Sequence, residues 1–154
     1  MAIETMPKGL IIAAPSSGSG KTVVTLGLLS ALRREGVNVA SFKAGPDYID
    51  PVFHAAATSR PCYNLDPWAM RPETLGTAVN AVGAVAELLI AEGVMGLFDG
   101  ATVDAGSTAD IAKRSGWPVV MVVDARAQGA SAAASVLGFS TFDPDVQVSG
   151  VIFN

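Results

Sequence analysis

A glycine-rich stretch, PSSGSGKT at residues 15–22, carries the residue types that bind phosphate. Gly18 and Gly20 permit a tight turn in which successive backbone N–H groups point inward at phosphate oxygens. In such a loop the Lys21 ammonium reaches the outer phosphates of a nucleotide and the Thr22 hydroxyl coordinates Mg²⁺. The stretch therefore predicts a site for a nucleotide and a magnesium ion.

The loop is a variant of the usual pattern G-x-x-x-x-G-K-[ST], because Pro15 stands where that pattern has its first glycine. Pro15 removes one backbone donor, but it lies before the part that wraps around phosphate. The alternative interpretation is a flexible Gly/Ser turn. The position of the loop between an apolar run and an amphipathic stretch favours the phosphate loop.

A second chemical stretch is FKAGPDYIDPVFH at residues 42–54. A cation, a carboxylate and a phenol after a strand could hold a phosphate, a Mg²⁺ ion and an acidic substrate. An Asx turn after Gly-Pro is an alternative role for Asp47, and a structural role is expected for His54. The side chains concerned are Lys43, Asp47, Tyr48, Asp50 and His54.

Two carboxylates occur in AEGVMGLFDG at residues 91–100, where Glu92 ends a predicted strand and Asp99 lies in a Gly-rich turn. Ligands bind at the carboxyl ends of the strands in open α/β sheets. We therefore expect Glu92 to contact Mg²⁺. Ordinary turn and cap roles remain the alternative for both residues.

The elements that must position these residues alternate along the chain. Apolar runs of strand length are separated by stretches with helical spacing, which is typical of a parallel sheet with helices on both faces. The fold class expected is a P-loop NTPase-like α/β fold with a mostly parallel sheet. Strands are predicted at 9–15, 37–44, 87–92, 118–124 and 148–153, and helices at 22–36, 73–82, 107–115 and 128–138.

Two local features refine this pattern. Residues 45–72 interrupt the alternation with prolines and aromatic residues, and we expect an ordered excursion that faces the substrate. Ser107 and Asp110 have the spacing of a helix N-cap and its capping box. Gly36 is expected to end the first helix.

Composition narrows the class of protein. The 154 residues suit one domain, and the net charge of −4 comes without a Lys/Arg-rich stretch, so nucleic acid is not an expected partner. Cys62 is the only cysteine, which excludes an intrachain disulfide and fits a reducing, cytoplasmic location. No apolar run approaches the roughly 20 residues that a membrane helix needs, so no membrane partner is expected.

Five motifs occur in a distinctive order: GSGKT, FKAGPDYIDP, NLDPW, EGVMGLFDG and GSTADIAK. With them the chain, from about Lys8 to Asn154, resembles the N-terminal synthetase domain of the cobyrinic and hydrogenobyrinic acid a,c-diamide synthases. The resemblance implies an ATP-dependent carbon-nitrogen ligase of cobalamin biosynthesis. It implies a corrinoid carboxylic acid as substrate, acyl-phosphate intermediates, and ammonia released from glutamine by a separate glutaminase domain.

The resemblance also implies roles for individual residues. Those that match nucleotide-binding positions are Ser17, Gly18, Ser19, Gly20, Lys21, Thr22 and, for adenine, Asn154. Those that match magnesium contacts are Thr22, Asp47 and Glu92. Those that match catalytic or substrate-site positions are Lys43, Asp47, Tyr48 and Asp99.

We expect the chain, residues 1–154, to be the N-terminal part of such a synthetase domain, cut short at its C-terminus and without the glutaminase domain. A homodimer is a further expectation. Two alternatives remain open at this point. One is a P-loop ATPase that acts as a switch or scaffold; against it, Ser16 and Ser17 stand near the start of the loop, where partition ATPases carry a lysine. The other is a dethiobiotin synthetase-like ligase with another substrate.

Overall fold

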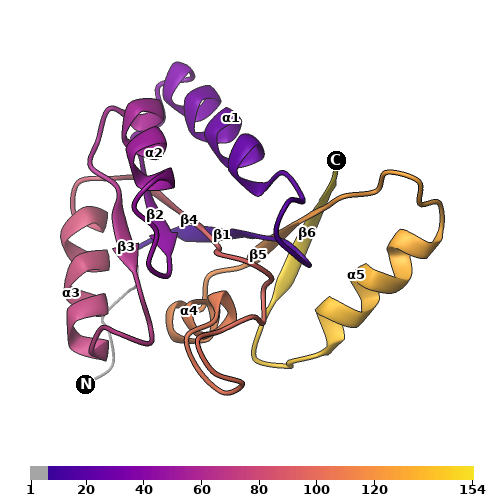
Figure 1. Ribbon diagram of the computed structural model, residues 1–154. Helices are drawn as coiled ribbons and strands as arrows, with labels where there is room; N and C mark the ends of the chain where they lie inside the picture. Colours follow the sequence, from indigo (N-terminus) through magenta and orange to yellow (C-terminus); the bar gives the residue numbers. More distant parts are fainter. Residues whose placement is uncertain (1–6) are drawn as a thin grey trace.

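Figure 1 shows the computed structural model, which describes residues 7–154. Strands and helices alternate along most of the chain. The strands are β1 (Gly9–Ala13), β2 (Val39–Ala44), β3 (Tyr63–Leu65), β4 (Leu88–Glu92), β5 (Val119–Val123) and β6 (Val148–Phe153). The helices are α1 (Lys21–Arg34), α2 (Asp50–Thr58), α3 (Pro72–Gly83), α4 (Thr108–Ser115) and α5 (Ser131–Thr141).

The strands form one six-stranded sheet in the order β3-β2-β4-β1-β5-β6. Every pairing in this sheet is parallel, which confirms the predicted α/β class. Because β4 lies between β1 and β2, the carboxyl ends of three strands far apart in sequence become neighbours. Glu92 is in register with both Ile12 and Lys43.

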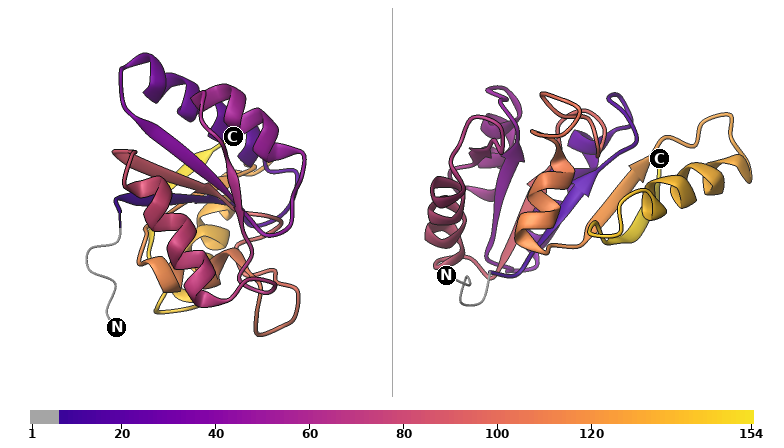
Figure 2. Two further views of the ribbon diagram at one scale, coloured as in Figure 1. Left: turned by 90° about the vertical axis from the view of Figure 1, so that its left-hand side faces the viewer. Right: turned by 90° about the horizontal axis from the view of Figure 1, so that it is seen from below.

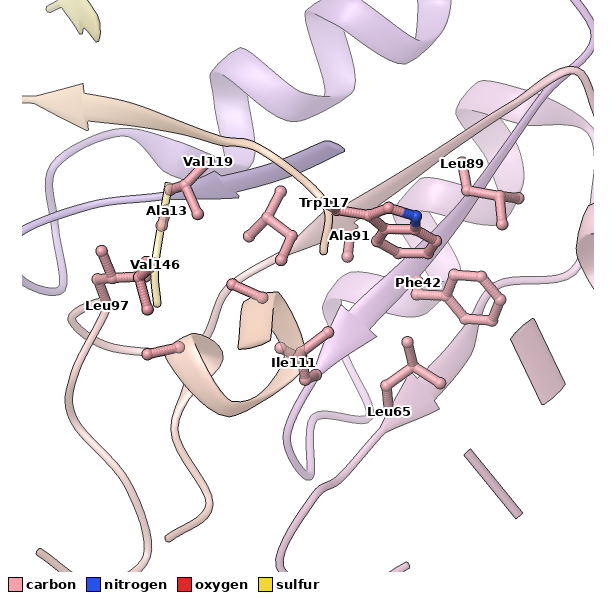
Figure 3. Packing of buried hydrophobic residues seen from close by; sticks show 14 of the residues in the cluster. Ala13, Phe42, Leu65, Leu89, Ala91, Leu97, Ile111, Trp117, Val119 and Val146 are labelled. Atoms are coloured by element: carbon pink, nitrogen blue, oxygen red, sulfur yellow. The ribbon is translucent and has the colours of Figure 1, made fainter. Parts of the chain in front are cut away.

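Helices cover both faces of the sheet (Figure 2). Helices α1 and α2 lie on one face, over a small core that includes Ile12, Leu29 and Ile90. Helices α3, α4 and α5 lie on the other face, over the larger core. Figure 3 shows part of that larger core, with Phe42 and Ile111 among the labelled residues.

Strand alternation decides which side chains enter the site. Phe42 and Ala91 are register partners and belong to the larger core. The next pair, Lys43 and Glu92, must then point to the opposite face, toward α1 and α2. The buried cation and carboxylate therefore lie under the two helices that follow β1 and β2.

The predicted helix boundaries have local causes. Gly36 adopts φ 82°, and the Gly36 and Val37 amides donate to the carbonyls of Arg33 and Leu32, which closes α1 as expected. Ser107 and Asp110 form the predicted capping box at the start of α4.

The segment 45–72 is ordered, as expected, but it holds two elements that the sequence did not reveal. Helix α2 begins at Asp50, and β3 adds an edge strand beside β2. Helix α5 begins three residues later than predicted, at Ser131. Within residues 7–154, no helix combines the length and hydrophobicity that crossing a membrane requires.

Candidate nucleotide-binding site

The glycine-rich loop joins β1 directly to α1. Gly18 and Gly20 have φ values of 80° and 90°, a region that favours glycine. The Ser19 hydroxyl donates to the Ser16 carbonyl at 3.0 Å, which closes the loop on itself. Helix α1 begins at Lys21, so its free N–H groups and its positive dipole end face the loop. This arrangement is suited to an anion.

Lys21 connects the loop to the segment that follows β4. Its side chain is buried, and Nζ donates to the Met95 carbonyl at 2.7 Å and to the Ser16 carbonyl at 3.3 Å. Burial, and then the nearby Lys43 charge, lower the pKa of Lys21. An incoming phosphate would meet an ammonium group that already lies at the loop.

Lys43 lies at the centre of a cluster of oxygen atoms. Its Nζ is 2.6 Å from Asp50 Oδ2 and 2.9 Å from Glu92 Oε1. The Thr22 hydroxyl donates to Glu92 Oε1 at 2.6 Å and lies 3.3 Å from Asp50 Oδ2. Burial alone would lower the pKa of Lys43, but the two carboxylates raise it, so the ammonium stays charged.

Glu92 is fully buried and uses both carboxylate oxygens. Oε1 accepts from Thr22 and Lys43, and Oε2 lies 2.6 Å from Nε2 of His54, which is also fully buried. Burial would raise the pKa of Glu92, but the His54 hydrogen bond and the Lys43 charge hold it below its usual range. Burial would lower the pKa of His54, but its contact with Cys62 and then its hydrogen bond to Glu92 raise that pKa to about 9.

Asp47 and Asp50 have different surroundings. Asp47 Oδ1 accepts from the backbone amides of Ile49 and Asp50, which is the Asx-type turn that opens α2. Its other oxygen lies 3.7 Å from Lys43 Nζ. Asp50 Oδ2, in contrast, contacts Lys43 and Thr22 directly.

The loop, the ends of β2 and β4 and the segments that follow these strands line an open cavity of about 370 Å³. It brings together most of the residues predicted for nucleotide and metal. Its lining residues are Ser17, Gly18, Gly20, Lys21, Thr22, Val23, Lys43, Asp47, Asp50, Glu92, Gly93, Val94 and Met95.

Four predicted site residues lie outside that lining: Ser19, Tyr48, Asp99 and Asn154. Tyr48 is 87% exposed and extends from the surface beside Asp47. Asp99 Oδ2 accepts from the Gly96 amide at 2.9 Å and borders a second cavity, of about 200 Å³. Asn154 donates from Nδ2 to the Ser19 carbonyl at 3.1 Å, so it contacts the loop from outside.

The oxygen ligands in the cavity fit magnesium. A hydroxyl on Thr22 and carboxylates on Asp50 and Glu92 are ligands that Mg²⁺ prefers. Among residues 7–154, no three His, Cys, Asp or Glu side chains form a metal cage of their own. Because Mg²⁺ is usually bound by one or two carboxylates together with substrate phosphates, the cavity suits a metal that arrives with a nucleotide.

The sequence pointed to Asp47 rather than Asp50 as a ligand and assigned no contact to His54 or Met95. Asp50 and His54 are four residues apart and start a helix, a spacing that places both on one helix face. That signal required α2 to be recognised. Nothing in the sequence indicated that the Met95 carbonyl would reach Lys21.

Known proteins resemble this chain in sequence and, more distantly, in fold. A family model described as the CobQ/CobB/MinD/ParA nucleotide binding domain, CbiA, matches residues 10–154. The hydrogenobyrinate a,c-diamide synthase of Brucella anthropi is 57% identical over 148 residues, which is 96% of this chain and 34% of that protein. The protein of the same name from Rhizobium meliloti is 56% identical over 146 residues, 95% of this chain and 34% of its own length.

Two solved structures share the fold at 14% sequence identity. One is the kinase domain of the Escherichia coli tyrosine kinase ETK, with a TM-score of 0.66 over 99% of this chain and 69% of that chain. The other is the signal recognition particle receptor FtsY from Elizabethkingia anophelis, with a TM-score of 0.65 over 98% of this chain and 51% of that chain. The chain spans about a third of the length of the curated relatives it matches. It belongs to the CbiA family of CobQ/CobB/MinD/ParA nucleotide-binding domains.

Proposed function

We propose that the chain binds Mg-ATP and is part of an enzyme that amidates the a and c carboxylates of hydrogenobyrinic or cobyrinic acid. The observation that carries the proposal is the convergence of Lys21, Thr22, Lys43, Asp50 and Glu92 on one cavity. The relatives named hydrogenobyrinate a,c-diamide synthase support the choice of substrate.

In this proposal the loop amides and Lys21 bind the β- and γ-phosphates of ATP. Thr22, Glu92 and Asp50 would hold Mg²⁺, with Asp47 close enough to contribute through water. The metal would neutralise charge on the phosphates. Phosphate binding would exchange the contacts of Lys21 with Met95 and Ser16 for contacts with phosphate oxygens.

The chemical need for ATP follows from the substrate. A carboxylate is a poor electrophile, so one of its oxygens attacks the γ-phosphorus, the bond from that phosphorus to ADP breaks, and an acyl phosphate forms. Ammonia then attacks the acyl carbon. The bond between that carbon and the bridging oxygen breaks, phosphate leaves with this oxygen, and the nitrogen loses a proton to give the amide. Lys43 would stabilise negative charge on the transferring phosphoryl group.

The residues around the cavity mouth have roles in the same proposal. Tyr48 is free to contact a large acidic substrate because its ring is exposed next to Asp47. Asp99 would bind substrate beside the loop, where the second cavity also includes Pro15. Asn154 would recognise adenine from its position against Ser19. Ammonia would come from glutamine at a glutaminase domain separate from residues 1–154.

The test is ATP hydrolysis by the complete protein that includes this chain, measured with and without hydrogenobyrinic acid. We expect the acid to stimulate hydrolysis, and K21A to reduce the stimulated rate about 100-fold or more, as loss of a key donor to developing charge does. K113A is the matched control, since Lys113 lies far along α4 in an exposed ion pair. Hydrolysis indifferent to the acid would reject the ligase and favour a nucleotide switch.

A further inference from the structure

His54 is a buried polar residue that does not line the nucleotide cavity. It lies on α2, and its side chain is fully enclosed between that helix and the sheet. A buried imidazole is costly unless its nitrogen atoms have partners. Nε2 has Glu92 Oε2 at 2.6 Å, and Nδ1 has Cys62 Sγ at 3.7 Å.

The contact with Glu92 has a defined direction. An ionised carboxylate can only accept hydrogen bonds, so Nε2 of His54 must carry the proton and donate it. Glu92 Oε2 has no contact with Thr22 or Lys43, which both use Oε1. His54 thus occupies one oxygen and leaves the other directed at the cavity.

Helix α2 links this contact to the rest of the cluster. Asp50 and His54 are four residues apart, so the same helix face delivers Asp50 to Lys43 and Thr22 and delivers His54 to Glu92. One turn further along α2, the Thr58 hydroxyl donates to the His54 backbone carbonyl at 3.0 Å.

We propose that His54 is the positioning residue for Glu92, which it holds in the rotation that directs Oε1 to Thr22 and to the bound metal. This inference rests on the proposed Mg-ATP site and adds a residue that acts through a ligand. Without a donor at this place, Oε2 would be buried without a partner, and the Glu92 carboxylate would rotate to bring Oε2 toward Lys43, which moves Oε1 away from Thr22. Groups that orient metal ligands commonly change metal affinity by about 10- to 100-fold when removed.

The test compares H54L with H54Q in the complete protein. Leucine is similar in size but has no donor, whereas the glutamine amide can place an N–H near the position of Nε2. T58V is the matched control, because it removes a buried hydroxyl from the same helix without touching Glu92. The readout is a Mg²⁺ titration at fixed ADP by calorimetry, with ADP affinity in EDTA measured separately.

We expect H54L to raise the Mg²⁺ concentration at half-saturation about 10- to 100-fold, with ADP affinity in EDTA nearly unchanged. H54Q and T58V should stay close to the wild type. If H54L does not fold, H54N replaces it, since its shorter amide cannot reach Glu92 and should show the same loss.

Two results would overturn the inference. Mg²⁺ binding by H54L or H54N equal to the wild type would do so, and so would equal weakening by T58V. Both results leave the proposed function standing. A wild-type protein whose ADP binding is independent of Mg²⁺ would overturn the proposed function and this inference together.

Discussion

The Thr22 hydroxyl lies 2.6 Å from Glu92 Oε1, although the two residues are 70 positions apart in the chain. The sheet order explains the contact, because β4 lies beside β1 and ends in register next to the start of the loop. The hydroxyl at the start of α1 and the carboxylate at the end of β4 therefore face the same cavity. A metal bound between them would also be at the phosphate loop.

Removal of the Thr22 hydroxyl should weaken metal-dependent binding selectively. We expect T22V to lose most of the gain in ADP affinity that Mg²⁺ gives, because valine keeps the shape but removes the oxygen ligand. T22S should keep that gain. Calorimetric titrations of ADP with Mg²⁺ and with EDTA check this, and a T22V variant that retains the full Mg²⁺ effect contradicts the assignment.

The two aspartates of the 42–54 stretch can be separated by substitution. D50N should weaken Mg²⁺-dependent ADP binding more than D47N, because Asp50 Oδ2 contacts Thr22 and Lys43 while Asp47 Oδ1 is committed to the turn before α2. Asparagine retains that turn, since its side-chain oxygen accepts the same backbone bonds. A larger loss for D47N in the same titration would instead favour Asp47 as the ligand.

Lys43 should contribute to stability as well as to the site. K43M removes the ammonium between Glu92 and Asp50, and it leaves the fully buried Glu92 carboxylate without one of its two cationic partners. Loss of one partner of a buried ion pair costs about 3–5 kcal/mol, so the urea midpoint of unfolding should fall markedly.

The control for K43M is K113M, whose ion pair with Asp143 is more exposed and should matter little. Equal urea midpoints for K43M and the wild type, measured without nucleotide, would show that the ammonium does not stabilise the carboxylates.

Much of the fold follows from local sequence features. The apolar runs predict β1, β4 and β5 because a strand of a parallel sheet is buried on both faces and is therefore apolar along its length. The helical spacing of apolar residues predicts α1 because only one face of that helix packs on the sheet. Helix α2 and strand β3 were missed because prolines and aromatics obscure their periodicity. Their positions depend on long-range packing against β2.

The site residues also divide into those that local sequence predicts and those that depend on long-range packing. The loop residues are predictable because GSGKT must lie between a strand and a helix to bind phosphate. The choice between Asp47 and Asp50 depends on where α2 begins, and the His54 contact depends on the register of β2 with β4. Neither can be read from residue types alone.

The most direct test of the central claim follows oxygen from substrate to phosphate. Hydrogenobyrinic acid labelled with heavy oxygen in its a and c carboxylates would be converted by the complete protein with ATP, Mg²⁺ and ammonium chloride. Mass spectrometry of the inorganic phosphate should find one labelled oxygen for each amide formed, because the acyl phosphate keeps a carboxylate oxygen on phosphorus. Amide formed alongside unlabelled phosphate would contradict the account.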